Sequence, residues 1–212
     1  MTRMIFVRHG ESEANIKRIF AGWTDAPLTE KGHRQAEVTA EFLKKYKIDV
    51  AYASDLQRAT DTARHIADAQ GIAVIPEQGL REIYAGDWEN RPFDEIEAQD
   101  ADAWQVWRNR IGEAHPTGGE TVAAFSARIA QTVDRIRRAH EGKTILIGTH
   151  ATPIRAMECL WRGLLLSEMQ TVTWVANASV TVVEYEEDDP ALVCCGVCDF
   201  MGDLLTGLPR NV

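Results

Sequence analysis

The residues Arg8-His9-Gly10-Glu11, close to the N-terminus, combine groups that can attack, bind and approach an anionic ligand. His9 offers an imidazole that can act as a nucleophile, and Arg8 offers a guanidinium that pairs well with oxyanions. Gly10 lets the backbone come close to a ligand, and the amide side chain of Asn15 follows six residues after His9. As a four-residue pattern, this segment alone is only suggestive.

Three other segments place a charged or titratable side chain just after an expected strand. Arg58 falls in the first turn of a helix, Glu82 follows a third strand, and His150 lies just before a helix N-terminus. Taken singly, each has an ordinary explanation, as a surface ion pair, a solvated carboxylate or a satisfied polar histidine. Their joint placement at strand ends makes one common site the better interpretation.

The pattern of apolar residues predicts the elements that would position these groups. Short apolar runs predict buried strands over 4–7, 50–53, 72–75 and 144–148, with two further strands over 180–186 and 191–197 near a sheet edge. Helices are expected from Thr29 as N-cap to about Tyr46, from a Ser54-Asp55 N-cap to before Gly71, over 120–140, and from near Pro153 to Leu164.

This alternation of strands and helices predicts an α/β fold, a three-layer α/β/α sandwich with a mostly parallel central sheet. The looser stretch at about 82–118, with its Gly, Pro and Trp residues, is expected to be an inserted helical lid within a single domain spanning 1–212. Ligands bind beyond the carboxyl ends of the strands in such sheets. The fold therefore predicts that His9 and His150, far apart in sequence, meet at one site.

The composition of the chain limits the classes of partner that it can bind. The chain has 45% hydrophobic and 26% charged residues, as in ordinary globular proteins, and its net charge of −9 argues against nucleic acid or an anionic membrane as the main partner. No apolar run approaches the ~20 residues of a membrane span, and the N-terminal apolar run is too short for a signal peptide. We expect a cytoplasmic monomer or homodimer. The four cysteines, three of them within 194–198, are expected to be buried or half-buried thiols.

With these segments in place, the chain resembles the histidine phosphatase superfamily, also called the phosphoglycerate-mutase-like family, from residue 5 to about residue 179. Its pattern is closest to the small broad-specificity and alpha-ribazole phosphatases. The resemblance is carried by Arg8-His9-Gly10-Glu11-Ser12, Gly22-Trp23, Asp25, Pro27-Leu28-Thr29, Gly32, Ser54-Asp55-Leu56, Arg58-Ala59, Thr62-Ala63, Leu80-Arg81-Glu82, Gly86-Asp87-Trp88-Glu89, Gly118-Gly119-Glu120-Thr121, Thr149-His150, Ile154-Arg155, Asn177 and Ser179.

The resemblance implies catalysis through a phosphohistidine intermediate, and we expect no cofactor. His9 would be the phosphorylated nucleophile, acting through Nε2. Arg8, Arg58 and His150 would form the phosphate pocket. Glu82 would donate a proton to the leaving group, which requires a protonated carboxyl and predicts a raised pKa.

Substrate contacts are expected from Asn15, Gly22, Trp23 and Ala151. Asn15 would add a side-chain donor, and Trp23 is the best candidate for contact with the substrate. Many relatives have glycine after the second histidine, where this chain has Ala151-Thr152. A backbone amide there can still serve a phosphate, so we expect a changed pocket shape and retained chemistry.

We expect no metal site, because the groups at the strand ends are chiefly cationic and would repel a divalent ion. Activity should therefore survive chelation.

Three functions stay open from the sequence. A phosphomonoester hydrolase acting on a small phosphorylated metabolite is favoured, because the segment at 82–118 is short and the acidic run 94–102 contains no basic residue. A cofactor-dependent phosphoglycerate mutase is the alternative, with Arg91, Arg108 and Arg110 as possible substrate contacts. A non-catalytic phospho-ligand sensor is the third, although binding alone needs neither a nucleophile nor an acid.

The aromatic residues at 88, 93, 104 and 107 would pack the lid onto the core or stack on a ring-bearing substrate.

Overall fold

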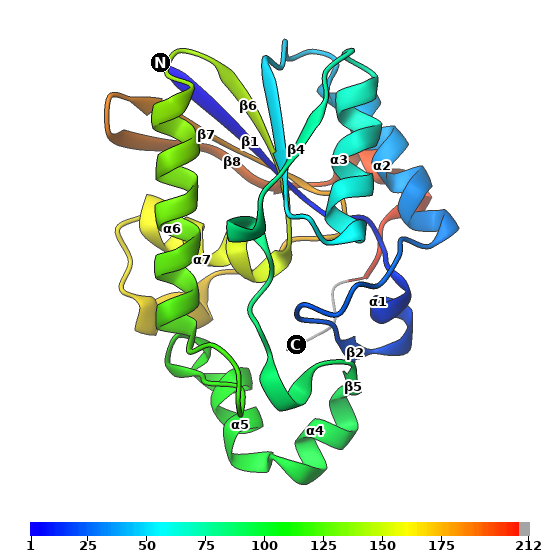
Figure 1. Ribbon diagram of the computed structural model, residues 1–212, viewed down its shortest axis with the longest axis vertical. Coiled ribbons are helices and arrows are strands. Elements are labelled where there is room, and N and C mark those ends of the chain that lie inside the picture. The colour runs from blue at the N-terminus through cyan, green and yellow to red at the C-terminus, as the bar shows by residue number, and fades with distance from the viewer. Residues whose placement is uncertain (208–212) are drawn as a thin grey trace.

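The computed structural model describes residues 1–207, which form a three-layer α/β/α sandwich (Figure 1). Its six-stranded sheet has the order β4-β3-β6-β1-β7-β8. The strands are β1 (Thr2–Arg8), β3 (Val50–Ala53), β4 (Val74–Pro76), β6 (Thr144–Thr149), β7 (Val180–Glu186) and β8 (Asp189–Val197). The pairs β4-β3, β3-β6 and β6-β1 are parallel, whereas β7 is antiparallel to both of its neighbours. The expected α/β sandwich with a mostly parallel sheet is confirmed.

The central strand β1 is buried on both faces. Met4 and Phe6 join an apolar cluster with α6 (Val122–Ala139) and α7 (Ala151–Trp161). Ile5 and Val7 join a second cluster with the helices α2 (Glu30–Leu43) and α3 (Gln57–Asp68) on the other side. Because successive residues of a strand point to opposite faces, a strand covered on both sides needs a continuous apolar run, which this segment has.

The two helices next to the site begin in different ways. Thr29 caps α2 as expected, its hydroxyl accepting from the amide of Gly32 at 3.0 Å. The expected Ser54-Asp55 cap of α3 is wrong, because α3 follows Leu56 and has no cap from its own flanking side chain. Asp25, from the first loop, instead accepts from the amide of Gln57 at 2.7 Å. The loop is thereby tied to the helix that carries Arg58.

Several boundaries differ from expectation for local reasons. The third strand begins at Val74 because the amide of Ile72 bonds back to the carbonyl of Ala67, closing the end of α3. Helix α2 ends at Leu43, before Tyr46. Helix α7 begins at Ala151 and keeps Pro153 in its first turn, where a missing N–H breaks no helical bond.

The insert between β4 and α6 contains α4 (Phe93–Gln99) and α5 (Ala101–Asn109), which lie at the far end of the molecule from the N-terminus in Figure 1. Its short strand β5 (Arg91–Pro92) pairs with β2 (Ile19–Phe20), which follows α1 (Glu13–Lys17) in the first loop. Trp88 and Trp104 are buried in the same apolar cluster as Phe6. They pack the insert onto the sheet, the commoner of the two expected roles.

No helix within residues 1–207 is both long enough and apolar enough to cross a membrane. Cys159 is buried in α7, and Cys194 and Cys195 are half-buried in β8.

The close packing of α3 on β6 predicts that one methyl group added at Gly148 destabilises the fold. A Cβ added at Gly148 would lie 2.8 Å from Cβ of Ala63 and 3.1 Å from Cβ of Ala53. Gly148→Ala should therefore lower the free energy of unfolding by about 1–3 kcal/mol, the usual cost of overpacking a core. Gly207→Ala, where an added Cβ meets nothing within 4 Å, is the matched control. Urea unfolding of both variants checks this, and equal midpoints would contradict it.

Candidate active site

The carboxyl edge of the sheet opens into a cavity of about 470 Å³. Seven of the expected site residues line it, namely Arg8, His9, Asn15, Gly22, Arg58, Glu82 and Ala151. Two do not, Trp23 and His150. The cavity thus collects groups from four separate segments of the chain.

His9 is held in the tautomer that a nucleophile needs. Its Nδ1 lies 2.7 Å from the carbonyl oxygen of Gly10, which can only accept, so Nδ1 donates and Nε2 keeps its lone pair. Burial, reinforced by the charges of Arg58 and Arg8, lowers the pKa of His9 well below its usual value. The imidazole is therefore neutral, with its lone pair on Nε2.

The backbone around His9 is anchored from three sides. The amide of His9 donates to the carbonyl of Thr149 at 2.9 Å, and its carbonyl accepts from the side chain of Asn177 at 3.1 Å. The next amide, of Gly10, donates to the hydroxyl of Thr62 at 2.9 Å. A Cβ at Gly10 would lie 2.5 Å from the carbonyl oxygen of Gly32, so only glycine fits there.

Arg8 and Arg58 are buried cations whose partners are carbonyl groups. Arg8 donates to the carbonyl of Val175 at 2.6 Å, and Arg58 donates to those of Gly22 and Thr24 at 2.8 Å each. Burial lowers the pKa of each guanidinium to about 10, so both stay charged at neutral pH. The Nε of each has no hydrogen-bond partner among residues 1–207. The charge of the pair is solvated without being neutralised, which suits an anion.

His150 lies behind His9, fully buried, with the two ring centroids 5.2 Å apart. Its Nε2 is 2.8 Å from the hydroxyl of Ser54, and its Nδ1 has no partner in the described chain. Burial and the charge of Arg58 lower its pKa well below the usual value. The two histidines meet as expected. The residue that holds His150 is Ser54, which the sequence suggested only as a helix cap.

Glu82 is half-buried at the cavity wall. Its carboxylate accepts from the amide of Ile83 at 3.0 Å and from that of Thr152, in the first turn of α7, at 3.3 Å. Burial raises the pKa of this carboxyl, and these hydrogen bonds oppose the rise only in part. A carboxyl with a raised pKa can arrive protonated and serve as a general acid.

Asn15 is oriented by hydrogen bonds to its carbonyl oxygen. Oδ1 accepts from the amide of Ser12 at 3.0 Å and from the side chain of Asn177 at 3.2 Å, which turns the amide nitrogen into a free donor at the cavity wall. Asn177 also lines the cavity, so it is a site residue that belongs to the resemblance but had no assigned role.

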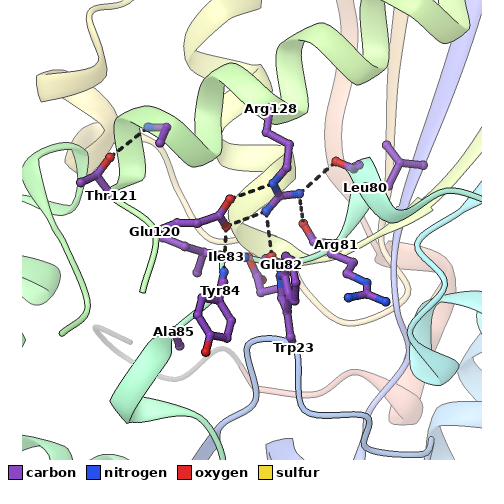
Figure 2. A network of polar contacts seen from close by, with 12 residues as sticks. Trp23, Leu80, Arg81, Glu82, Ile83, Tyr84, Ala85, Glu120, Thr121 and Arg128 are labelled. Atoms are coloured by element: carbon purple, nitrogen blue, oxygen red, sulfur yellow. Dashed lines mark hydrogen bonds and ion pairs between the residues drawn. The ribbon is translucent and has the colours of Figure 1, made fainter. Parts of the chain in front are cut away.

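The guanidinium of Arg128, in α6, donates hydrogen bonds to the backbone around Glu82 (Figure 2). It donates to the carbonyls of Gly79 at 3.0 Å, Arg81 at 3.2 Å and Glu82 at 3.1 Å. It also forms a bidentate pair with Glu120, at 2.9 and 2.8 Å. We call Arg128 and Glu120 the Glu82 clamp. Sequence reasoning missed it because a charged residue on an amphipathic helix looks like a solvated one.

Trp23 supports the same segment from the other side. Its indole N–H donates to the carbonyl of Glu82 at 2.8 Å, and its ring lies 4.7 Å from the guanidinium of Arg81. The side chain contacts Tyr84, with ring centroids 5.1 Å apart, and appears beside Glu82 in Figure 2. The structure thus places Trp23 behind the acid and outside the cavity lining.

Aromatic side chains form another part of the cavity lining. Phe20, Phe93, Trp107 and Trp174 all line the cavity. Trp174 lies in an irregular segment after α7, where no periodic pattern could have singled it out. Nowhere within residues 1–207 do three or more His, Cys, Asp or Glu side chains gather in a group that could hold a metal ion.

Comparison with known proteins agrees with this geometry. The family model of the histidine phosphatase superfamily (branch 1) matches residues 4–197. The adenosylcobalamin/alpha-ribazole phosphatase of Salmonella typhimurium is 35% identical over 150 residues, which cover 70% of this chain and 73% of that protein. The 2,3-bisphosphoglycerate-dependent phosphoglycerate mutase of Brucella anthropi is 34% identical over 199 residues, covering 86% and 96%.

A solved structure, that of YhfR from Bacillus stearothermophilus, superimposes with a TM-score of 0.91 at 29% identity and covers 95% of this chain and 100% of that one. The resemblance seen in the sequence is confirmed. The chain belongs to the histidine phosphatase superfamily, branch 1, and its similar proteins include both a phosphatase and a mutase.

Proposed function

We propose that this protein is a phosphomonoester hydrolase that acts on a small phosphorylated metabolite through a phosphohistidine intermediate at His9. The observation that carries the proposal is the neutral imidazole of His9, with Nδ1–H donated to Gly10, beside two buried guanidinium groups and a carboxyl of raised pKa. The nucleophile, the two guanidinium groups and the acid line the same cavity. A sensor would need only the two guanidinium groups.

In the first step, the lone pair of Nε2 of His9 attacks phosphorus and the ester P–O bond breaks. Arg8 and Arg58 balance the charge on the non-bridging oxygens, and Glu82 gives its proton to the departing alkoxide. In the second step, the Glu82 carboxylate takes a proton from water, whose oxygen attacks phosphorus. The P–N bond then breaks, which releases phosphate and restores neutral His9 and protonated Glu82.

Hydrolysis is favoured over isomerisation by the charges near the cavity. A mutase must hold and reorient a bisphosphorylated intermediate, and the candidates for that task were Arg91, Arg108 and Arg110. None of the three lines the cavity. Arg108 and Arg110 instead pair with Glu97 at 3.5 Å and Glu113 at 3.1 Å.

A panel of phosphate esters tests this function. We expect phosphate release from several esters, including p-nitrophenyl phosphate, unaffected by chelator or by 2,3-bisphosphoglycerate. His9→Ala should release no phosphate above background, because it removes the attacking atom. Isomerisation of 3-phosphoglycerate that depends on 2,3-bisphosphoglycerate would instead establish the mutase. Binding without any turnover would establish the sensor.

Glu82→Gln tests the acid. In the wild-type protein, the rate of His9 phosphorylation should fall at alkaline pH as Glu82 loses its proton, and the raised pKa of Glu82 moves this limb upward in pH. The rate should also fall at acid pH as His9 becomes protonated. The variant should lose the alkaline limb and about 100-fold in rate with an alkyl ester, within the usual range for general acids. With p-nitrophenyl phosphate, whose leaving group needs little protonation, the loss should be small. Equal losses for both esters would rule out this role.

Arg128→Gln tests the Glu82 clamp, with Arg138→Gln, a surface residue of the same helix, as control. Misplacing the acid should lower kcat for an alkyl ester roughly 10-fold to 100-fold and leave KM nearly unchanged. Because the clamp acts through Glu82, the double variant with Glu82→Gln should be little slower than Glu82→Gln alone. Additive losses in rapid-mixing kinetics would show that Arg128 acts independently of Glu82.

A further inference from the structure

Among residues 1–207, the cavity lining holds one ionisable residue besides the four already described. The ionisable residues of the lining are Arg8, His9, Arg18, Arg58 and Glu82. All but Arg18 belong to the phosphate-binding and acid groups already described. The same lining includes the apolar or aromatic side chains of Ile19, Phe20, Phe93, Trp107 and Trp174. Of these, Ile19 follows Arg18 in the chain and Phe93 donates its amide to the carbonyl of Arg18. Arg18 is an exposed residue, so its side chain borders both the cavity and solvent.

Arg18 is held in place through its backbone. It ends α1 in the left-handed region, with φ of 53°, and its amide donates to the carbonyls of Ala14 and Asn15. Its own carbonyl accepts from the amide of Phe93, the first residue of α4, at 3.1 Å. The root of the side chain is therefore fixed between the loop that carries the catalytic residues and the insert.

The charge of Arg18 has no carboxylate partner in the described part of the chain. It forms no ion pair with any carboxylate of residues 1–207. The nearby arginines of the insert differ, since Arg91 pairs with Glu95 and Arg108 with Glu97. In a chain of net charge −9, an unpaired guanidinium on a cavity wall is available to a ligand.

A second unpartnered donor belongs to a residue of the same cavity lining. Trp107 is 3% exposed, lines the cavity, and its indole N–H has no acceptor within residues 1–207. Buried N–H groups are normally hydrogen-bonded, so an unpartnered one on a residue of the cavity lining is consistent with a ligand that brings an acceptor.

We infer that Arg18 is a specificity-determining residue that binds a carboxylate on the leaving group of the substrate. The inference rests on the hydrolase function proposed above and narrows its substrate to phosphomonoesters that bear a carboxylate on an apolar or planar frame. One guanidinium matches the single charge of a carboxylate. A second phosphate would bring a charge of about −1.5 to −2, which one guanidinium does not balance.

A matched pair of esters tests the inference. 4-Carboxyphenyl phosphate and 4-carbamoylphenyl phosphate have the same size and frame, but only the first carries the second charge. The wild-type protein should prefer the carboxylate in kcat/KM by roughly tenfold, the worth of one charge-assisted hydrogen bond, mainly through a lower KM. Arg18→Gln should abolish this preference, mainly by raising KM for the carboxylate, and Arg18→Glu should reverse it.

Arg110→Gln is the control, because Arg110 lies outside the cavity and pairs with Glu113. It should keep the wild-type preference. Raising the salt concentration should reduce the preference of the wild-type protein and leave Arg18→Gln unaffected. Hydrolysis of both esters with no preference, or with a preference that survives in Arg18→Gln, would overturn the role of Arg18 while leaving the hydrolase intact. Hydrolysis of neither ester would count against the hydrolase itself.

Discussion

Two guanidinium groups are buried beside an uncharged imidazole, and the site depends on how their charge is accommodated. Removing a cation from water costs several kcal/mol unless polar groups replace the lost hydration. Here the replacement comes from backbone carbonyls, of Val175 for Arg8 and of Gly22 and Thr24 for Arg58. Carbonyl dipoles solvate a cation without cancelling it, so the positive potential stays available to a phosphate. The loops that supply these carbonyls are consequently part of the site.

The same potential acts on the protonation of His9 and Glu82 in different ways. It acts with burial to hold His9 neutral, whereas burial raises the pKa of Glu82 against the opposing charge of Arg58. Their pKa values are displaced in opposite directions, so the proposed nucleophile and the proposed acid are both in the required form at one pH. Position matters as much as charge, and the backbone of Glu82 receives hydrogen bonds from Arg128 in α6 and Trp23 in the first loop. Two distant segments thereby converge on the backbone carbonyl of Glu82.

The sequence predicted the sheet and the placement of its strand ends, because apolar runs followed by His9 or His150 are local signals. It failed where a contact joins distant elements. Ser54 had the local signature of a helix cap, but its hydroxyl is used by His150, and Asp25 from the first loop takes over the cap. Trp23 was expected to contact the substrate. Its indole N–H instead donates to the carbonyl of Glu82, which is 59 positions away in sequence, so no local pattern indicates the contact. Such roles are decided by tertiary packing, which periodicity does not encode.

The central claim is that Nε2 of His9 accepts the phosphoryl group because Nδ1 is committed to the carbonyl of Gly10. Rapid quenching at alkaline pH, where phosphohistidine survives, followed by ³¹P NMR and peptide mapping, tests it most directly. The account predicts a phosphoenzyme on the His9 peptide with the resonance of Nε2-phosphohistidine, formed and lost at rates compatible with turnover. A phosphoenzyme on Nδ1 or on any other residue, or turnover with no phosphoenzyme, would contradict it.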